Sequence, residues 1–266
     1  MTVKAPVLWP QNCYIRPIRL ATEGQRAFTH LAELKDPDGF SCRGYIKHFP
    51  AGATKGLFNE WFGYTVMASL GIPQPICAIL QAPIFGSTTN ETAYAFVSCQ
   101  PSPVYEGTPK EHYTPDDPIK YAALLKRLFD CPALPSLIAA DQLLMNADRN
   151  LGNLVFTGKS SFVAIDHGEI LGGIAWQARD LIAPTIWAES KPMEVWTAID
   201  QLRPSLKSAI YASAEIVQEK FYEVQQSLRE ALDCTTHSDS AIALDAVWWR
   251  CLKLANWHAD RLQLLV

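Results

Sequence analysis

The stretch DQLLMNADRNLGNLVFTGKSSFVAIDHG, residues 141–168, decides how the rest of the chain is interpreted. An apolar segment ends in a polar loop that carries Asp148 and, five residues later, Asn153. Two short apolar segments follow around a Gly-Lys-Ser turn, and the second of them ends at Asp166. This alternation predicts a β-hairpin over 154–165 that brings Asp166 back beside Asn153.

These side chains are the ones that phosphoryl transfer from a magnesium-bound nucleotide needs. Asp148 can accept or orient the proton of an attacking hydroxyl. The oxygen atoms of Asn153 and Asp166 are hard ligands of the kind that Mg²⁺ prefers, and Asn150 is a further candidate for a phosphate contact. The plainer alternative is a polar turn between a helix and a strand. The order of carboxylates and amides, with hydrophobic strands behind them, favours a site.

Three further residues are expected to support this loop. Asp141 lies in an apolar helix, where a buried carboxylate must be hydrogen-bonded, and we expect it to bind backbone amides of the loop. Arg149 is either a charge partner or a phosphate contact. Gly168 is expected to permit a sharp turn after Asp166. His167 is interpreted as structural, because no serine in a nucleophile-elbow sequence accompanies it.

A lysine and a glutamate upstream supply the other half of such a site. Lys47 lies in the strand-like YIKHF, and Glu60 lies in a predicted helix over 56–70 that Gly71 ends. Each could be a solvated surface charge when taken alone. Together they predict the strand-lysine and helix-glutamate pair with which protein kinases hold the α- and β-phosphates of ATP.

The first hundred residues read as a small antiparallel lobe. The expected strands cover 13–21, 28–34, 41–49, 76–85 and 93–99. Gly24 and Gln25 lie in the first turn, where a loop over the phosphates would be, although a plain hairpin turn is the better interpretation when this segment is taken alone. The backbone of Ser98, Cys99 and Gln100 is expected to bind the adenine edge.

The Pro-rich segment 100–109 reads as a linker, so we expect residues 1–102 to form an N-lobe and 103–266 a C-lobe. Helices are expected over 116–130, 136–146, 205–232 and 240–264. The last is rich in Trp on more than one face. The expected fold class is α+β: a two-lobed protein-kinase-like fold, with a small antiparallel sheet and one helix preceding a larger, mainly helical lobe.

Composition excludes several classes of protein. Of 266 residues, 48% are hydrophobic and 19% charged, which is typical of a globular chain. The formal net charge of −4 gives no support for a nucleic-acid-binding surface. The N-terminus resembles neither a signal peptide nor a membrane anchor, and the seven scattered Cys contain no C-x-x-C. We therefore expect reduced cysteines and a cytoplasmic location.

The stretch DQLLMNADRNLGNLVF…VAIDHG resembles the catalytic and metal-binding motifs of the HipA-like kinase family. More distantly, it is similar to type II phosphatidylinositol 4-kinases. The upstream stretch GYIKHFPAGATKGLFNEWFGYTVMASLGIPQP also resembles the HipA-like pattern, so that the likeness spans about 18–168. The resemblance implies ATP and Mg²⁺ as cofactors.

Residue by residue, the resemblance implies Lys47 and Glu60 as the nucleotide pair, Asp148 as the catalytic aspartate, and Asn153 and Asp166 as metal ligands. The expected activity is transfer of the γ-phosphate of ATP to Ser or Thr of a protein. A lipid or small-molecule acceptor is the alternative within the enzyme class. The alternative of another class is an inactive pseudokinase, or a toxin–antitoxin component that works by contact with a small regulatory or antitoxin protein.

Overall fold

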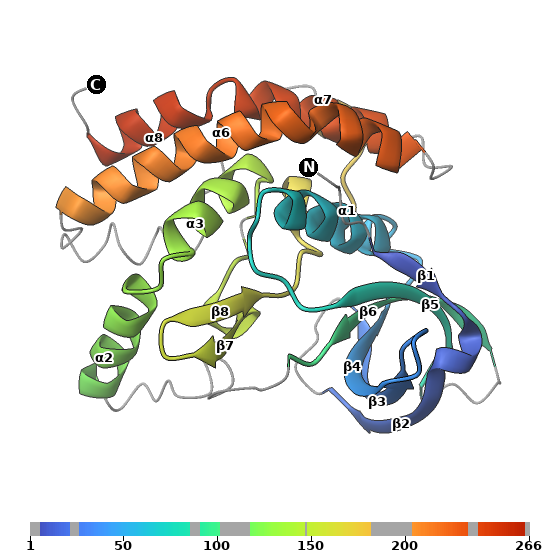
Figure 1. The fold of residues 1–266 in the computed structure, drawn as a ribbon. Coiled ribbons are helices and arrows are strands. Elements are labelled where there is room, and N and C mark those ends of the chain that lie inside the picture. Colours follow the sequence, from blue (N-terminus) through green and yellow to red (C-terminus); the bar gives the residue numbers. More distant parts are fainter. Residues whose placement is uncertain are drawn as a thin grey trace.

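A sheet and a layer of helices make up the two parts of the protein in Figure 1. The computed structural model describes residues 6–21, 27–85, 91–101, 118–146, 148–181, 204–233 and 239–263. The first three ranges hold the sheet and one helix, and the remaining ranges hold a hairpin and the other helices. This order is the mixed α+β arrangement that the sequence predicts.

The sheet has six strands in the order β1-β5-β6-β4-β3-β2. All neighbouring strands are antiparallel except β1 and β5, which are parallel. β1 was missed in the sequence, because three residues are too few for an alternating pattern. The strands are β1 (Val7–Trp9), β2 (Tyr14–Leu20), β3 (Phe28–Lys35), β4 (Ser41–His48), β5 (Cys77–Pro83) and β6 (Thr92–Cys99), with a 3-10 turn η1 (Gln11–Cys13) between the first two.

Helix α1 (Gly56–Ser69) forms where it was predicted. Gly71 just beyond its end has a positive φ of 81°, a conformation that glycine adopts without strain. The N–H of Ile72 then donates to the carbonyl of Met67 at 3.0 Å, which closes the helix end.

The described residues of the helical part form a hairpin, six α-helices and two short 3-10 turns. These elements are α2 (Pro118–Phe129), α3 (Leu134–Leu143), η3 (Leu151–Asn153), β7 (Leu154–Gly158), β8 (Ser161–Ala164), η4 (Ile170–Gly172), α4 (Ala178–Leu181), α6 (Pro204–Asp233), α7 (Asp239–Cys251) and α8 (Leu254–Leu262). Two predicted helices differ. The helix expected over 136–146 ends at Leu143, because Met145 takes a positive φ of 55°. The helix expected over 240–264 is divided between α7 and α8 by a turn at Leu252 and Lys253, where the sequence has neither Gly nor Pro.

The hydrophobic residues form two clusters, and α1 belongs to the helical one. Phe58, Phe62, Val66 and Met67 of α1 are buried together with residues of α3, α6, α7 and the β7–β8 hairpin. The sheet encloses a separate, smaller cluster around Leu34. Although α1 precedes the predicted lobe boundary, its apolar face is therefore packed into the helical part. The boundary itself, at residues 102 and 103, lies outside the described residues.

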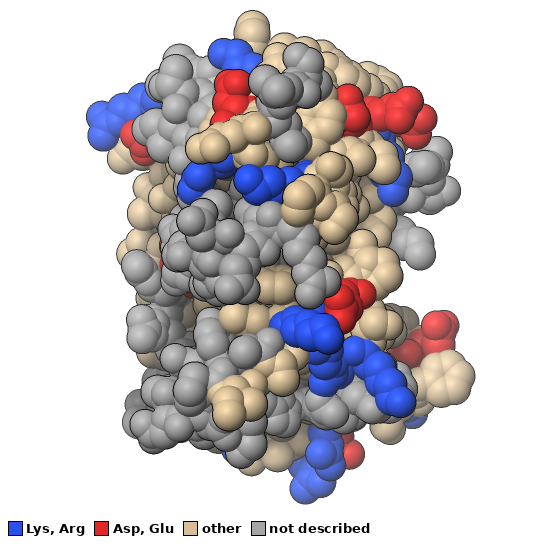
Figure 2. All heavy atoms as spheres, turned by 90° about the vertical axis from the view of Figure 1, so that its left-hand side faces the viewer, with Lys and Arg blue, Asp and Glu red and all other residues tan. Residues whose placement is uncertain are grey.

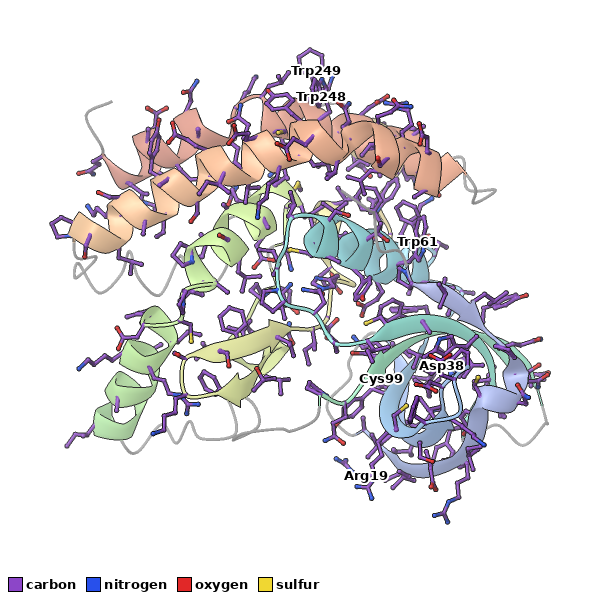
Figure 3. The ribbon with its side chains drawn as sticks, in the orientation of Figure 1. Arg19, Asp38, Trp61, Cys99, Trp248 and Trp249 are labelled. Atoms are coloured by element: carbon purple, nitrogen blue, oxygen red, sulfur yellow. The ribbon has the colours of Figure 1, made fainter. Side chains whose placement is uncertain are left out.

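The surface agrees with the composition. Side chains of both signs are interspersed on the face shown in Figure 2. Figure 3 shows Trp249 at the outer side of α7, where it is 54% exposed, whereas Trp248 packs edge-on against Tyr222 with ring centroids 5.0 Å apart. Within the described ranges every cysteine is a free thiol. No helix among the described residues is both long and apolar enough to cross a membrane.

Candidate functional site

The ammonium of Lys47 lies between two carboxylates where the sheet meets the helical part. It is 2.5 Å from Oε1 of Glu60 on α1 and 3.0 Å from Oδ1 of Asp166 after β8. Lys47 and Glu60 are only 13 residues apart, on a strand and the helix that follows it, whereas Asp166 comes much later in the chain, just after the β7–β8 hairpin. The structure thus brings together the lysine and glutamate that the sequence paired, and it adds Asp166 to them.

The protonation states of these groups depend on one another. Burial alone would lower the pKa of Lys47, but the carboxylates of Asp166 and Glu60 raise it. Burial raises the pKa of Glu60 against the opposing effect of the Lys47 charge. Burial acts in the same direction on Asp166, yet the Lys47 ammonium holds the pKa of Asp166 at about 2. One ammonium therefore lies beside two carboxylates, so that the three groups together carry a net negative charge.

The loop around Asp148 is held by amide side chains. The N–H of Asp148 donates to Oδ1 of Asn146 at 3.2 Å. The carbonyl of Asp148 accepts from Nδ2 of Asn150 at 3.1 Å and from Nδ2 of Asn153 at 3.0 Å. The backbone of Asp148 is thus fixed on both sides, and its half-buried side chain is presented from a rigid turn.

Asn150, predicted as a phosphate contact, is occupied within this loop. Its Oδ1 accepts from the N–H of Gly152 at 2.8 Å, while its Nδ2 donates to the carbonyl of Asp148. Both ends of the amide therefore shape the turn into η3, and the structure gives Asn150 a role in the loop itself. A side chain that bonds its own turn in this way is typical of Asn.

Asp141 and Arg149 form a buried ion pair beneath the loop. Arg149 Nε lies 3.0 Å from Oδ2 and 3.2 Å from Oδ1 of Asp141, and the side chains are 0% and 1% exposed. Asn146 Nδ2 also donates to Asp141 at 2.9 Å. The prediction that backbone amides would bind Asp141 is therefore wrong, because side chains of the loop occupy both of its oxygens. Arg149 is fully buried as a charge partner, so it does not face a phosphate.

Arg149 also ties the loop to the turn after β8. Its Nη1 donates to the carbonyls of Asn153 and Ile165, and its Nη2 contacts Nδ1 of His167 at 3.0 Å. Because arginine only donates, Nδ1 accepts, and Nε2–H donates to Oε1 of Gln74 at 2.7 Å. Burial, with the charge of Arg149, lowers the pKa of His167 well below its ordinary value. His167 is thus a neutral linker inside the protein, as the structural interpretation expects.

Asn153 and Asp166 are the residues that could hold a divalent cation. The hairpin forms as predicted. The N–H of Ile165 donates to the carbonyl of Asn153 at 2.9 Å, so that the two candidate ligands extend from neighbouring backbone segments. Nδ2 of Asn153 is engaged with Asp148, which directs Oδ1 away from that bond. Asp166 is 44% exposed. No cluster of three His, Cys, Asp or Glu side chains suited to a metal occurs in the described ranges.

The sharp turn after β8 is made by Asp166 and not by Gly168. Asp166 has a positive φ of 64°, whereas Gly168 does not have a positive φ. A Cβ on Gly168 would meet only ordinary contacts, the nearest at 3.6 Å. The predicted reason for Gly168 is therefore wrong, because an aspartate can adopt the left-handed conformation itself.

The expected adenine-binding backbone is partly occupied. Cys99, at the end of β6 in Figure 3, donates its N–H to the carbonyl of Ile76 at 2.8 Å. Gln100 donates its N–H to the carbonyl of Arg43 at 2.7 Å. Ser98 is 8% exposed and paired within the sheet. The N–H groups of Cys99 and Gln100 are thus committed to the protein and cannot donate to adenine. Gly24 and Gln25, expected near the phosphates, lie outside the described residues.

Two contacts that sequence reasoning missed involve Asn59 and Gln74. Asn59 is fully buried and its amide bonds the chain that follows the Asp166 turn. Gln74 holds His167. A buried polar residue in an apolar helix is a recognisable signal for Asn59, because such a group must find a partner. Gln74 gave no signal, since its neighbours are prolines of a connecting segment.

Comparison with known proteins shows a shared fold. No family model and no curated protein matches this chain. A similar solved structure is that of a Helicobacter pylori proinflammatory kinase, CtkA, with a TM-score of 0.57 and 14% sequence identity. The match covers 96% of this chain and 98% of that one. The predicted fold class is therefore confirmed: a sheet part and a helical part arranged as in a kinase structure.

Proposed function

We propose that this protein is a kinase of the HipA-like type, which transfers the γ-phosphate of ATP to Ser or Thr of a protein with Mg²⁺ as cofactor. The observation that carries the proposal is the position of Lys47 between Glu60 and Asp166, at 2.5 Å and 3.0 Å. In kinases the same three kinds of residue hold the nucleotide phosphates and the metal.

The charges of this group support a ligand. A buried lysine needs one carboxylate to compensate its charge, and Glu60, 1% exposed, already provides it. Asp166 is a second carboxylate that remains 44% exposed. The excess negative charge would be compensated by a divalent cation at Asp166, and Lys47 would then be available to the α- and β-phosphates of ATP.

Each residue has a proposed part in the transfer. Asn153 and Asp166 would hold Mg²⁺, which when bound neutralises charge on the phosphate oxygens. Asp148 would accept or orient the proton of the acceptor hydroxyl. Glu60 would keep Lys47 extended towards the phosphates. Since the N–H groups of Cys99 and Gln100 are occupied, they would not be the donors to adenine.

The presence of the whole set supports an active enzyme. Lys47, Glu60, Asp148, Asn153 and Asp166 are all retained, whereas an inactive relative commonly lacks at least one of these groups. The protein acceptor rests on the HipA-like resemblance of the sequence. A lipid or small-molecule acceptor is the outcome that the experiment must distinguish.

The test begins with nucleotide binding. Wild-type protein titrated with ATP and Mg²⁺ in a calorimeter should bind, and Asp148→Asn should bind equally well but transfer no phosphate. Asp166→Asn should weaken binding of Mg-ATP itself. Asp245→Asn is the matched control, because Asp245 is 61% exposed in a surface pair with Arg229 and should change neither property.

The acceptor is then identified with labelled ATP. Incubation of the protein with cell lysate, followed by separation of protein, lipid and small-molecule fractions, should place the label on protein Ser or Thr. Label in the lipid or small-molecule fraction would overturn the protein acceptor. Absence of Mg-ATP binding by the wild-type protein would overturn the kinase proposal as a whole.

A further inference from the structure

Asn59 of α1 bonds the chain segment that follows the Asp166 turn, although Asn59 has no part in the proposed phosphate transfer. Its side chain is 0% exposed. Its Nδ2 lies 2.7 Å from the carbonyl of Gly168, 3.2 Å from that of Ile170 and 2.9 Å from that of Gly173. A single amide group on the helix thus serves three carbonyls of the segment that follows the proposed metal ligand.

Two of these carbonyls, those of Gly168 and Gly173, need a donor from outside their own segment. Leu171, Gly172 and Gly173 all have positive φ values, of 58°, 90° and 112°. A chain wound in this way forms neither a regular helix nor a strand, so that its carbonyls cannot all pair within the segment. The carbonyl of Ile170 also accepts from the N–H of Gly173 at 3.1 Å, whereas the carbonyl of buried Gly168 has no backbone donor among the described residues, and an unpaired buried carbonyl is costly. The Asn59 amide supplies the missing donor.

Trp176 fixes the orientation of that amide. Its indole Nε1–H donates to Oδ1 of Asn59 at 2.9 Å. Indole nitrogen only donates, so it must face the amide oxygen, and the NH₂ group is then directed at the carbonyls. Trp176 is itself 4% exposed and packs edge-on against Phe58 with ring centroids 5.8 Å apart. The amide cannot rotate by 180° without losing all of its bonds.

The helix that carries Asn59 is held at both ends by the helical part. Near its start, Lys55 Nζ lies 2.5 Å from Oδ2 of Asp239 on α7 and 4.7 Å from the centre of the Trp176 ring. At its end, Lys220 of α6 donates to the carbonyl of Leu70 at 3.1 Å. α1 is therefore tied to the helical part at both ends, which limits how far the helix can shift after a change at Asn59.

Glu60, the next residue along α1, completes the connection to the turn. Its Oε2 accepts from the N–H of His167 at 2.9 Å, while its Oε1 holds Lys47. One turn further, Gly63 lies so close to the same residue that an added Cβ would be 2.5 Å from Cβ of His167. Asn59, Glu60 and Gly63 thus form one face of α1 that is fitted to the backbone on either side of the turn.

We propose that Asn59 is a positioning residue: by holding the carbonyls of Gly168, Ile170 and Gly173, it determines where α1 places the Asp166 carboxylate. The inference rests on the proposed function in so far as Asp166 holds the metal. Loss of the amide would leave the turn free to move away from Lys47 and from Asn153. Weaker binding of Mg²⁺ would follow even where the protein remains folded.

The first measurement uses the full-length protein without nucleotide. Hydrogen–deuterium exchange of the peptide covering 166–176 is compared in wild type, Asn59→Leu and Thr65→Val. Thr65 is the matched control, because it is equally buried on the same helix but donates only to Trp61 of that helix. Exchange should rise by about ten- to a hundredfold in Asn59→Leu and stay near the wild-type rate in Thr65→Val.

The second measurement is the Mg²⁺ concentration at half-saturation of ATP binding. It should rise about tenfold or more in Asn59→Leu and remain unchanged in Thr65→Val, because loss of stability alone does not alter the metal ligands. If Asn59→Leu does not fold, Trp176→Phe decides, since it keeps a smaller aromatic ring and removes the donor that orients the amide.

The outcomes separate the two proposals. Equal exchange in Asn59→Leu and wild type, or an equal rise in Thr65→Val, would overturn the positioning role of Asn59. If exchange rises only in Asn59→Leu but the Mg²⁺ concentration at half-saturation does not change, the positioning role is overturned as well. If wild type does not bind Mg-ATP, the proposed function fails, while the exchange result still shows whether Asn59 holds the turn.

Discussion

The buried ion pair of Asp141 and Arg149 provides the most quantitative test of the structure. Arg149→Met removes a guanidinium that bonds both oxygens of Asp141, the carbonyls of Asn153 and Ile165, and Nδ1 of His167. The Asp141 carboxylate would keep only the 2.9 Å bond from Asn146. Breaking a buried pair from one side costs about 3–5 kcal/mol, because a charge is left without its partner.

That cost is large compared with the whole stability of a domain, which is about 5–15 kcal/mol. Asp141→Asn is nearly isosteric and leaves the buried guanidinium facing a neutral amide, so we expect a cost of about 2–4 kcal/mol. The double variant has neither charge. Its loss should be smaller than the sum of the two single losses by about 2–3 kcal/mol.

The assay is urea unfolding at pH 7, followed by circular dichroism, of wild type, both single variants and the double variant. The exposed pair of Arg16 and Glu33 is the control, since its atoms are 2.7 Å apart but its side chains are 71% and 37% exposed. Its coupling energy should be below about 1 kcal/mol. Equal coupling energies for the buried and the exposed pair would refute the argument that burial makes the first one matter.

Three further predictions concern other contacts. Gly63→Ala should lower the free energy of unfolding, measured in urea, by about 1–3 kcal/mol, because its Cβ would lie 2.5 Å from His167 Cβ. Gly52→Ala is the control and should be close to neutral, because a Cβ there would enter open space. Arg250→Met removes the donors to the carbonyls of Gln142 and Leu143, at 2.9 and 3.0 Å, at the end of α3. Arg250→Met should lower the free energy of unfolding in urea by about 2–4 kcal/mol, whereas exposed Arg229→Met should lower it by less than about 1 kcal/mol. His258 is buried, its ring nitrogens have no partner in the described ranges, and burial lowers its pKa from 6.5 to about 4. The unfolded chain then binds the proton more readily, so stability should fall by up to about 3 kcal/mol as pH drops from 6.5 to 4, and His258→Phe should remove that part of the slope.

The sequence by itself determined the local elements of the site. The apolar segments around the Gly-Lys-Ser turn predict the hairpin, and the strand and helix patterns place Lys47 and Glu60 correctly. These features depend on spacing within one element and its turn, which the chain's covalent geometry fixes. The fold class followed from the same elements, taken in order.

Only the tertiary structure decided which residues serve the site from a distance. Arg149 turned out to be the partner of Asp141, the N–H groups of Cys99 and Gln100 proved to be occupied, and α1 joined the core of the helical part. Asn59 reaches carbonyls that are 109 to 114 residues away in the sequence. A pattern of residue types cannot show such pairs, because a buried polar group requires a partner but does not specify which one. The packing of α1 against the Asp166 turn determines which carbonyls become the partners of Asn59.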